Sequence, residues 1–313
     1  MRKSIFHETW WLDAIAPGRW RQIDCVQGGR TTGSLPFVEI IEGGLKICAM
    51  PPATHVLGPT VADPPGKTEA SGRARRATIR RLLGHLDGHD HVEMVLDTGF
   101  ADLTPFLHAG FEVKPDPTFL LDCRQPLEAL WAGLRDKTRN VIRRAREQLT
   151  VGEERDIARF ARYYEDNLAG DDSYFDIAAS CAAIAAAHTR QQARILAARD
   201  VAGVAHAMTV FLWDERKVYY FHSSRIGARA HIGAVSLLVW SGIELAHSLG
   251  LGFDFDGGLL KPSRYKFLAS FGGEIANRYE VTRSNRIYRI QHFIRRVPRG
   301  IARRVHAIGS PQV

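Results

Sequence analysis

Apolar and polar positions along the first half of the chain predict mixed α/β structure. Glu42-Gly43-Gly44 separates two short apolar runs, which is typical of a β-hairpin. Residues 61–71 are rich in proline, glycine, aspartate and threonine, so we expect a loop there. The pattern predicts strands at 35–41, 45–50 and 92–96, and a basic helix at about 73–86.

The second half carries longer periodic segments. In the segment 233–250, apolar or small residues recur at spacings of three and four along one face, and Gly250 closes the segment as a C-terminal glycine does. The same reasoning predicts helices at 127–149, 156–168, 175–189 and 233–250, and strands at 193–198, 203–213, 218–223 and 253–255.

An internal repeat is the most informative feature. Residues 95–99 and 105–113 of the first half correspond to residues 254–258 and 266–274 of the second. Each copy contains a helix, a buried strand ending in aspartate and glycine, a Phe-Leu helix end, an aromatic residue with glycine, a glutamate and a final strand. A chance coincidence of two Phe-Leu segments is the alternative, but the matching order indicates two fused homologous domains.

Several strings resemble tandem acetyltransferase-fold (GNAT) proteins related to the Fem-type aminoacyltransferases. These strings are Trp10-Trp11-Leu12-Asp13-Ala14 and the segments 137–145, 236–243, 253–258 and 270–274. The resemblance implies an α/β fold of two tandem GNAT-like domains, each a mixed twisted sheet flanked by helices. We expect domains at 1–126 and 127–282, the second with the active cleft, and a basic C-terminal helix within the tail 283–313.

The resemblance also implies a reaction. Such proteins move an acyl group from a carrier to a primary amine, and Fem-type members take the aminoacyl group from aminoacyl-tRNA. We therefore expect amide formation on a small molecule or a cell-envelope precursor, with no tightly bound cofactor. One alternative is an N-acetyltransferase that uses acyl-CoA, and another is a non-catalytic module that binds RNA or a protein partner.

The expected donor site departs from the CoA-binding loop Q/R-x-x-G-x-G/A of single-domain relatives. Arg225 and Arg229 precede the helix that begins at Gly233 and Ala234, but the arginine-to-glycine spacing does not fit. The first-turn N–H groups could still hold an anion, while the departure favours aminoacyl-tRNA. Arg139 and Arg143 are four apart on one helix and could clamp a phosphate or form a solvated basic face; they complete the expected donor-binding set.

Amide formation requires an amine that has lost a proton. Asp254 and Asp256 end one predicted strand, and residues two apart share a face, so we expect two carboxylates in one pocket. The alternative is that they cap the following turn. Tyr220 and His222 share a face of the preceding strand. Tyr220 is a candidate for the acid that protonates the leaving group. His222 is a candidate for a general acid or base, and the alternative is a hydrogen-bonded histidine of the core.

A lysine found in many Fem-type proteins has no direct counterpart here. Leu268 occupies its position, three residues before the phenylalanine of the "FG" turn, and Lys266 lies two residues earlier. Lys266 is therefore a weaker candidate for the catalytic site, or simply a surface lysine.

Charge is concentrated near the C-terminal end. The 313-residue chain has a formal charge of +8, and eight arginines lie between 283 and 304 without an acid: Arg283, Arg286, Arg289, Arg295, Arg296, Arg299, Arg303 and Arg304. This segment is interpreted as a solvated helix, a polyanion-binding element or a membrane-surface helix. RNA contact through phosphates would weaken steeply with salt.

Other signals are absent from the sequence. No run of 18 apolar residues predicts a membrane span, and the first residues lack an apolar signal core, so we expect a cytoplasmic protein without stable membrane insertion. The four cysteines are widely spaced, which favours reduced thiols over disulfides or zinc. The cluster of His85, His89 and His91 has a spacing that disfavours a structural metal, so we expect none.

Overall fold

A computed structural model describes residues 3–62, 68–168, 176–227 and 230–296 of the protein. The first half contains the 3₁₀ helix η1 (Ile5–His7), helices α1 (Thr9–Ile15), α2 (Thr68–Gly84) and α3 (Thr104–His108), and strands β1 (Trp20–Gln27), β2 (Arg30–Glu42), β3 (Leu45–Ala49), β4 (Thr60–Val61), β5 (His91–Leu96) and β6 (Glu112–Asp122).

The second half is richer in helix. Its helices are α4 (Leu127–Gly133), α5 (Asp136–Gln148), α6 (Ile157–Leu168), α7 (Ile177–Thr189), α8 (Ala234–Ser248), α9 (Pro262–Leu268), η2 (Ala269–Phe271) and α10 (Arg286–Arg296). Its strands are β7 (Thr150–Glu153), β8 (Ala193–Arg199), β9 (Ala205–Trp213), β10 (Lys217–Arg225), β11 (Gly252–Asp254) and β12 (Glu274–Ser284). The predicted hairpin is confirmed, because Glu42 of β2 pairs with Leu45 of β3.

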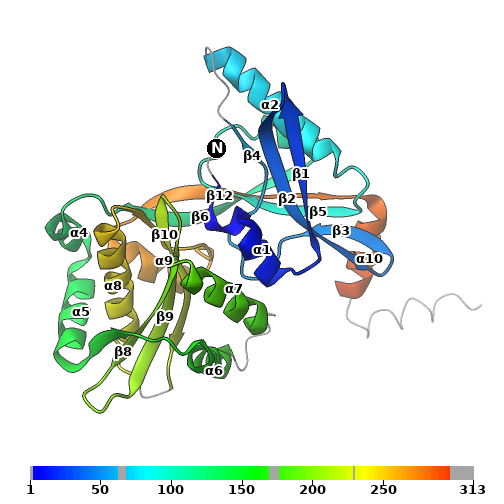
Figure 1. The fold of residues 1–313 in the computed structure, drawn as a ribbon. Coiled ribbons are helices and arrows are strands. Elements are labelled where there is room, and N and C mark those ends of the chain that lie inside the picture. Colours follow the sequence, from blue (N-terminus) through cyan, green and yellow to red (C-terminus); the bar gives the residue numbers. More distant parts are fainter. Residues whose placement is uncertain (1–2, 63–67, 169–175, 228–229, 297–313) are drawn as a thin grey trace, which may run out of the picture.

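One continuous mixed sheet joins the two halves. Among the described residues its order is β1-β2-β3-β5-β12-β6-β11-β10-β9-β8-β7, with β4 paired to β2. The last strand of each half is exchanged: β12 pairs with β5 of the first half, and β6 pairs with β11 of the second. Figure 1 shows β6 and β12 running together between the halves. Because of this exchange, neither half completes its own sheet.

Helices cover both faces of the second-half sheet (Figure 1). Apolar residues of α4, α5 and α8, among them Ile142 and Trp240, form one core with the inward faces of β9, β10 and β11. On the opposite face α6 and α7 pack with η1 and α1 of the first half, so that Phe6 and Trp11 share a core with Phe221 of β10. The N-terminal segment therefore contacts the central strand of the other half.

The predicted helix 127–149 is two helices, which corrects the sequence prediction. Leu134 and Arg135 have extended backbone between α4 and α5. Arg139 donates to the carbonyls of Ala132 at 2.8 Å and Leu134 at 2.7 Å, at the end of α4. Buried Leu134 packs in the core at this break. The sequence does not predict this break, because the helical periodicity is the same on both sides of it. The hydrogen bonds that stabilise it come from the side chain of Arg139, one turn further on.

The basic tail is described only in part. Helix α10 contains Arg286 and Arg289, and Ile287 and Ile290 are exposed on it. Arg299, Arg303 and Arg304 lie outside the described residues. No helix in the described ranges is long and apolar enough to cross a membrane.

Candidate functional site

Strands β10 and β11 part after a short parallel pairing. The pairs run from Lys217↔Gly252 to Tyr219↔Asp254 and then stop, although β10 continues to Arg225. The chain beyond Asp254 stays with β6, since Phe255 N donates to Phe119 O at 3.0 Å. Opposite β9, the register of β10 shifts between Tyr220 and His222, which makes Phe221 a bulge. A wedge therefore opens on the β11 side of β10.

A pocket of about 500 Å³ lies at this wedge. One wall is formed by residues 220–223 of β10 and by Tyr164 of α6. The remaining lining comes from Asp256, from Arg264, Phe267 and Leu268 of α9, and from residues 53–55 of the first half. The pocket thus combines aromatic surface with one carboxylate, one guanidinium and two histidines.

Asp256 is the carboxylate of the pocket. Its oxygens lie 3.2 Å from Arg278 Nη1, 3.1 Å from Arg264 Nη2 and 3.3 Å from His55 Nδ1. Burial by itself would raise its pKa, but His55 in its protonated form and the guanidinium groups of Arg278 and Arg264 outweigh burial and hold the pKa below its ordinary value. Asp256 is therefore ionised at neutral pH.

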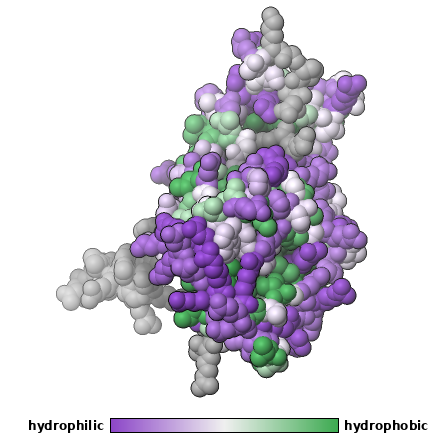
Figure 2. All heavy atoms as spheres, turned by 90° about the vertical axis from the view of Figure 1, so that its left-hand side faces the viewer, coloured by the Kyte–Doolittle hydropathy of each residue, from purple (hydrophilic) through white to green (hydrophobic). Residues whose placement is uncertain are grey.

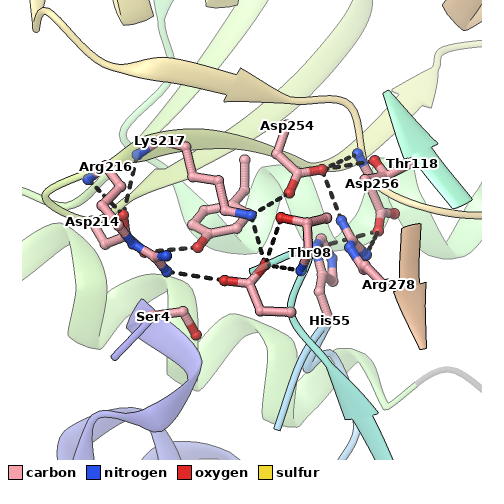
Figure 3. Close-up of polar contacts among 12 residues, drawn as sticks. Ser4, His55, Thr98, Thr118, Asp214, Arg216, Lys217, Asp254, Asp256 and Arg278 are labelled. Carbon is pink, nitrogen blue, oxygen red and sulfur yellow. Dashed lines mark hydrogen bonds and ion pairs between the residues drawn. The ribbon is translucent and has the colours of Figure 1, made fainter. Parts of the chain in front are cut away.

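Asp254 lies apart from the pocket, in a buried ionic network. It is fully buried and accepts hydrogen bonds from Thr118 Oγ1, Lys217 Nζ and Arg278 Nη2, each at 2.8 Å. Figure 3 shows Lys217 and Arg278 on either side of its carboxylate. Burial favours the neutral form, but Arg278 and Lys217 hold the pKa of Asp254 far below its ordinary value.

The structure therefore corrects the prediction that the two aspartates share a pocket. Strand β11 ends at Asp254, and Asp256 has a φ of 66°, so the strand alternation does not extend to it. The positive φ turns Asp256 towards the pocket while Asp254 points into the network. Arg278 bridges the two carboxylates. Whether either acts in catalysis remains a prediction.

Tyr220 and His222 both line the pocket, together with Phe221 between them. Burial lowers the pKa of His222 to about 3, with a further lowering from His55, so this ring is neutral. Burial raises the pKa of Tyr220, which keeps its hydroxyl protonated. A protonated Tyr220 is compatible with the predicted leaving-group acid, and a neutral His222 is compatible with a base or a hydrogen-bonded ring but not with an acid at neutral pH. These roles stay predictions.

The remaining candidates lie elsewhere. Lys266 is exposed on α9 and does not line the pocket, whereas Leu268, at the position of the family lysine, does. Arg139 caps α4 and pairs with Asp136. Arg143 donates to Asn140 Oδ1 at 3.1 Å and lies over the ring of Trp131.

The start of α8 is occupied by local contacts. Gly233 N donates to His231 Nδ1 at 3.1 Å, and Ala234 N donates to His231 O at 3.1 Å. A Cβ at Gly233 would lie 2.9 Å from Val141 O, so the close packing of α5 requires a glycine here. Arg225 donates to Ala230 O at 2.9 Å. Arg229 lies outside the described residues.

Sequence reasoning missed three residues of this region. His55 reaches the pocket from a loop of the first half, and Asp97 and Lys217 form a buried ion pair at 3.0 Å. Asp97 occupies the repeat position equivalent to Asp256, and this equivalence was the one feature of the sequence that could have marked Asp97 as important. Nothing in the local sequence marks His55 or Lys217. No group of three or more histidine, cysteine, aspartate or glutamate side chains suited to a metal occurs among the residues described.

Solved structures share this architecture, although the sequence matches no family model and no curated protein. FemX is 11% identical, with 87% of this chain and 90% of FemX covered and a TM-score of 0.66. The C-terminal domain of a putative lysylphosphatidylglycerol synthetase from Agrobacterium fabrum is 14% identical, with 90% and 89% covered and a TM-score of 0.54.

A tandem GNAT protein from the clavulanic acid biosynthesis pathway is 15% identical, with 87% of this chain and 86% of that protein covered and a TM-score of 0.50. At such identities the likeness concerns the fold. The predicted fold class is confirmed: the chain has a Fem-like, tandem GNAT-related α/β fold.

Proposed function

We propose that the protein is an N-acyltransferase that forms an amide bond in the wedge between β10 and β11. The observation that carries this proposal is the pocket of about 500 Å³ beside the parted strands, with an ionised carboxylate at its wall. A parted strand offers backbone N–H groups that no neighbouring strand uses, and such groups can polarise a carbonyl. The acceptor amine and the donor carbonyl can therefore meet at one place.

Asp256 is suited to bind the acceptor amine. Its carboxylate is ionised, lines the pocket and would attract a cationic or hydrogen-bonding nitrogen. Tyr220, with a hydroxyl that stays protonated, is suited to give a proton to the leaving group. The donor carbonyl would lie along β10 near the bulge at Phe221, where the ladder to β9 is interrupted.

For the donor we favour aminoacyl-tRNA over acyl-CoA. The first N–H groups of the corresponding helix hold the pyrophosphate in CoA-dependent relatives, whereas here the N–H groups of Gly233 and Ala234 already bond His231. An exposed basic face of α5 offers Lys137, Arg143 and Arg144 for phosphate contacts. Figure 2 looks onto the side where α4 and α5 lie, and hydrophilic side chains cover much of it.

The acceptor is proposed to be the primary amine of a small molecule or of a cell-envelope precursor. The experiment incubates the full chain with a pool of charged tRNA, or with acetyl-CoA, and a library of primary amines, and detects new amides by mass spectrometry. Loss of product after ribonuclease treatment identifies tRNA as the donor, whereas product in RNA-free acetyl-CoA identifies the alternative.

Substitution of Asp256 tests the site. We expect Asp256→Asn to raise the KM for the amine and lower the rate at least about tenfold, because the amine loses an ionic partner. Asp102→Asn is the matched control, since Asp102 is half-exposed, pairs with Arg76 and does not line the pocket. If the wild-type chain forms no amide from either donor but still binds RNA, the result favours the non-catalytic binding module instead.

A further inference from the structure

The first half closes its own version of the wedge with residues 50–59. Its strands β3 and β5 are parallel neighbours, as β10 and β11 are in the second half. After β3 the chain returns to β5, where Leu57 N donates to Val95 O at 2.9 Å. Val56 and Leu57 are buried, and His7 Nε2 lies 3.2 Å from Gly58 O. The segment is therefore anchored on both sides.

This anchored segment presents His55 to the pocket of the other half. The side chain of His55 is only 10% exposed and lines the pocket. Its ring packs against Phe6, with centroids 4.9 Å apart, and against Phe221 at 5.2 Å. Aromatic contacts from both halves hold the ring in one orientation.

The two ring nitrogens have different surroundings. Nδ1 is buried and lies 3.3 Å from Asp256 Oδ1, close enough for a charge interaction but without hydrogen-bond geometry. Nε2 is the nitrogen that remains for the pocket. A buried histidine in the wall of a cleft, with one nitrogen beside an ionised carboxylate, is an arrangement suited to a general base.

We propose that His55 is the catalytic base that takes the proton of the acceptor amine, with Asp256 stabilising the imidazolium that forms. This inference rests on the proposed acyl transfer and assigns to it a residue from the first half of the chain. The base and the wedge then come from different halves of the chain.

The step balances with these residues alone. The amine nitrogen attacks the donor carbonyl carbon, a C–N bond forms, and the carbonyl electron pair moves to the oxygen. His55 Nε2 takes a proton from the attacking nitrogen. When the intermediate collapses, the C–O bond of the tRNA ester, or the C–S bond of a thioester, breaks. The leaving group receives a proton from Tyr220 or the imidazolium, and His55 returns to its neutral form, directly or by reprotonating Tyr220.

The protonation state supports this role. Burial lowers the pKa of His55, and Asp256 opposes that lowering while Arg278 adds to it. Asp254 and Arg264 act more weakly in opposite directions, and the nearby His222 is neutral. His55 is therefore neutral at pH 7 and able to accept a proton.

The test compares His55→Gln with His89→Gln in the full chain. His89 is also a buried histidine of the first half, but it bonds Glu39 and lies outside the pocket. With whichever donor and amine the wild type converts, His55→Gln should lower kcat by about 10²–10⁴-fold and leave the KM of the donor nearly unchanged. His89→Gln should retain the wild-type kcat per folded molecule.

Two further readouts separate a base from a structural residue. The kcat of the wild type should fall with acid as His55 is protonated, below pH 6.5, and His55→Gln should lack this limb. Hydroxylamine is a weakly basic nucleophile whose nitrogen gives up its proton to water more easily after attack, so it should lose much less rate in His55→Gln than an alkyl amine does. If His55→Gln does not fold, His55→Asn, which keeps a nitrogen near Asp256, takes its place.

The outcomes are distinguishable. A wild type that converts no donor overturns the proposed function and the role of His55 with it. A wild type that is active, with a His55→Gln variant of equal kcat or an unchanged acid limb, overturns the role of His55 and leaves the acyl transfer standing. A loss of rate that is equal for hydroxylamine and alkyl amines also contradicts a base, because it indicates a structural role.

Discussion

The ammonium group of Lys217 lies 3.0 Å from Oδ1 of Asp97, so strand β10 of the second half is ion-paired with the residue that follows β5 of the first half, in the interior of the protein. The same ammonium lies 2.8 Å from Asp254 Oδ2 (Figure 3). Both contacts are desolvated, because Lys217 is 9% exposed and the carboxylates 6% or less. The network therefore couples the wedge to the interface between the halves.

Replacement of Lys217 should destabilise the fold strongly. Lys217→Met leaves Asp97 and Asp254 without this shared cation, and breaking a buried ion pair costs about 3–5 kcal/mol. Denaturant unfolding followed by circular dichroism measures this change. Lys46→Met, which removes a half-exposed pair with Glu39, is the matched control and should change stability by about 0–1 kcal/mol. Equal effects of the two substitutions would contradict a dominant role for the network.

Acid should weaken the folded state through Asp97. Burial acts to raise its pKa, but Lys217 and Arg216 outweigh it and lower the pKa from 3.8 to about 2. A lowered folded pKa stabilises the protein above pH 3.8, and this contribution is lost as the pH falls to about 2. It is of the order of 2 kcal/mol.

The measurement is the free energy of unfolding as a function of pH, for the wild type and for Lys217→Met. The variant should lose less stability between pH 3.8 and 2 than the wild type does, since the cation that lowers the pKa of Asp97 is gone. Identical slopes in the two proteins would show that another group dominates this range.

Gly233→Ala should loosen the contact between α5 and α8. The added Cβ would lie 2.9 Å from Val141 O and 3.0 Å from Ala145 Cβ, so a helix has to shift. Overpacking of this kind costs about 1–3 kcal/mol. Gly84→Ala is the control, because a Cβ added there would have no atom within 4 Å apart from its chain neighbours and the backbone of its own helix. Thermal unfolding compares the two, and an unchanged midpoint for Gly233→Ala would sink the packing explanation.

Arg139 and Arg143 should differ, although the sequence places them together. Arg139→Ala leaves the carbonyls of Ala132 and Leu134 without a charged donor and should cost about 1–3 kcal/mol of stability. Arg143 is exposed, so Arg143→Ala should change stability by about 0.5 kcal/mol or less.

If tRNA is the donor, we expect the opposite order for tRNA affinity, with the larger loss in Arg143→Ala. Arg143→Ala should weaken tRNA binding in filter-binding or fluorescence titrations and make it less dependent on salt, because one phosphate contact is lost. Arg139→Ala, measured on folded protein, should bind nearly as the wild type does. The reverse result would return Arg139 to the phosphate-binding set.

The local pattern of this chain predicted many of its elements, and the family resemblance of several strings predicted its fold. Strands β8 to β10, helix α8 and the repeated strand, helix and strand around Asp97 and Asp256 follow from periodicity, glycines and repeated strings. The edge strand β1 was missed because its apolar residues do not alternate regularly with polar ones and most of its side chains are exposed. Tyr220, His222 and Asp256 were predicted and line one pocket, because each lies in or beside a strand of the central sheet.

Contacts between distant segments placed the other groups. The exchange of β6 and β12, the pairing of Asp97 with Lys217 across 120 positions and the entry of His55 into the pocket have no local signature. Periodicity reports which face of an element is buried, whereas these contacts depend on which faces meet when both halves pack. Asp254 and Asp256 show the difference most clearly. They are two residues apart in sequence, but the left-handed backbone at Asp256 places its side chain in the pocket, whereas Asp254 lies in the buried ionic network.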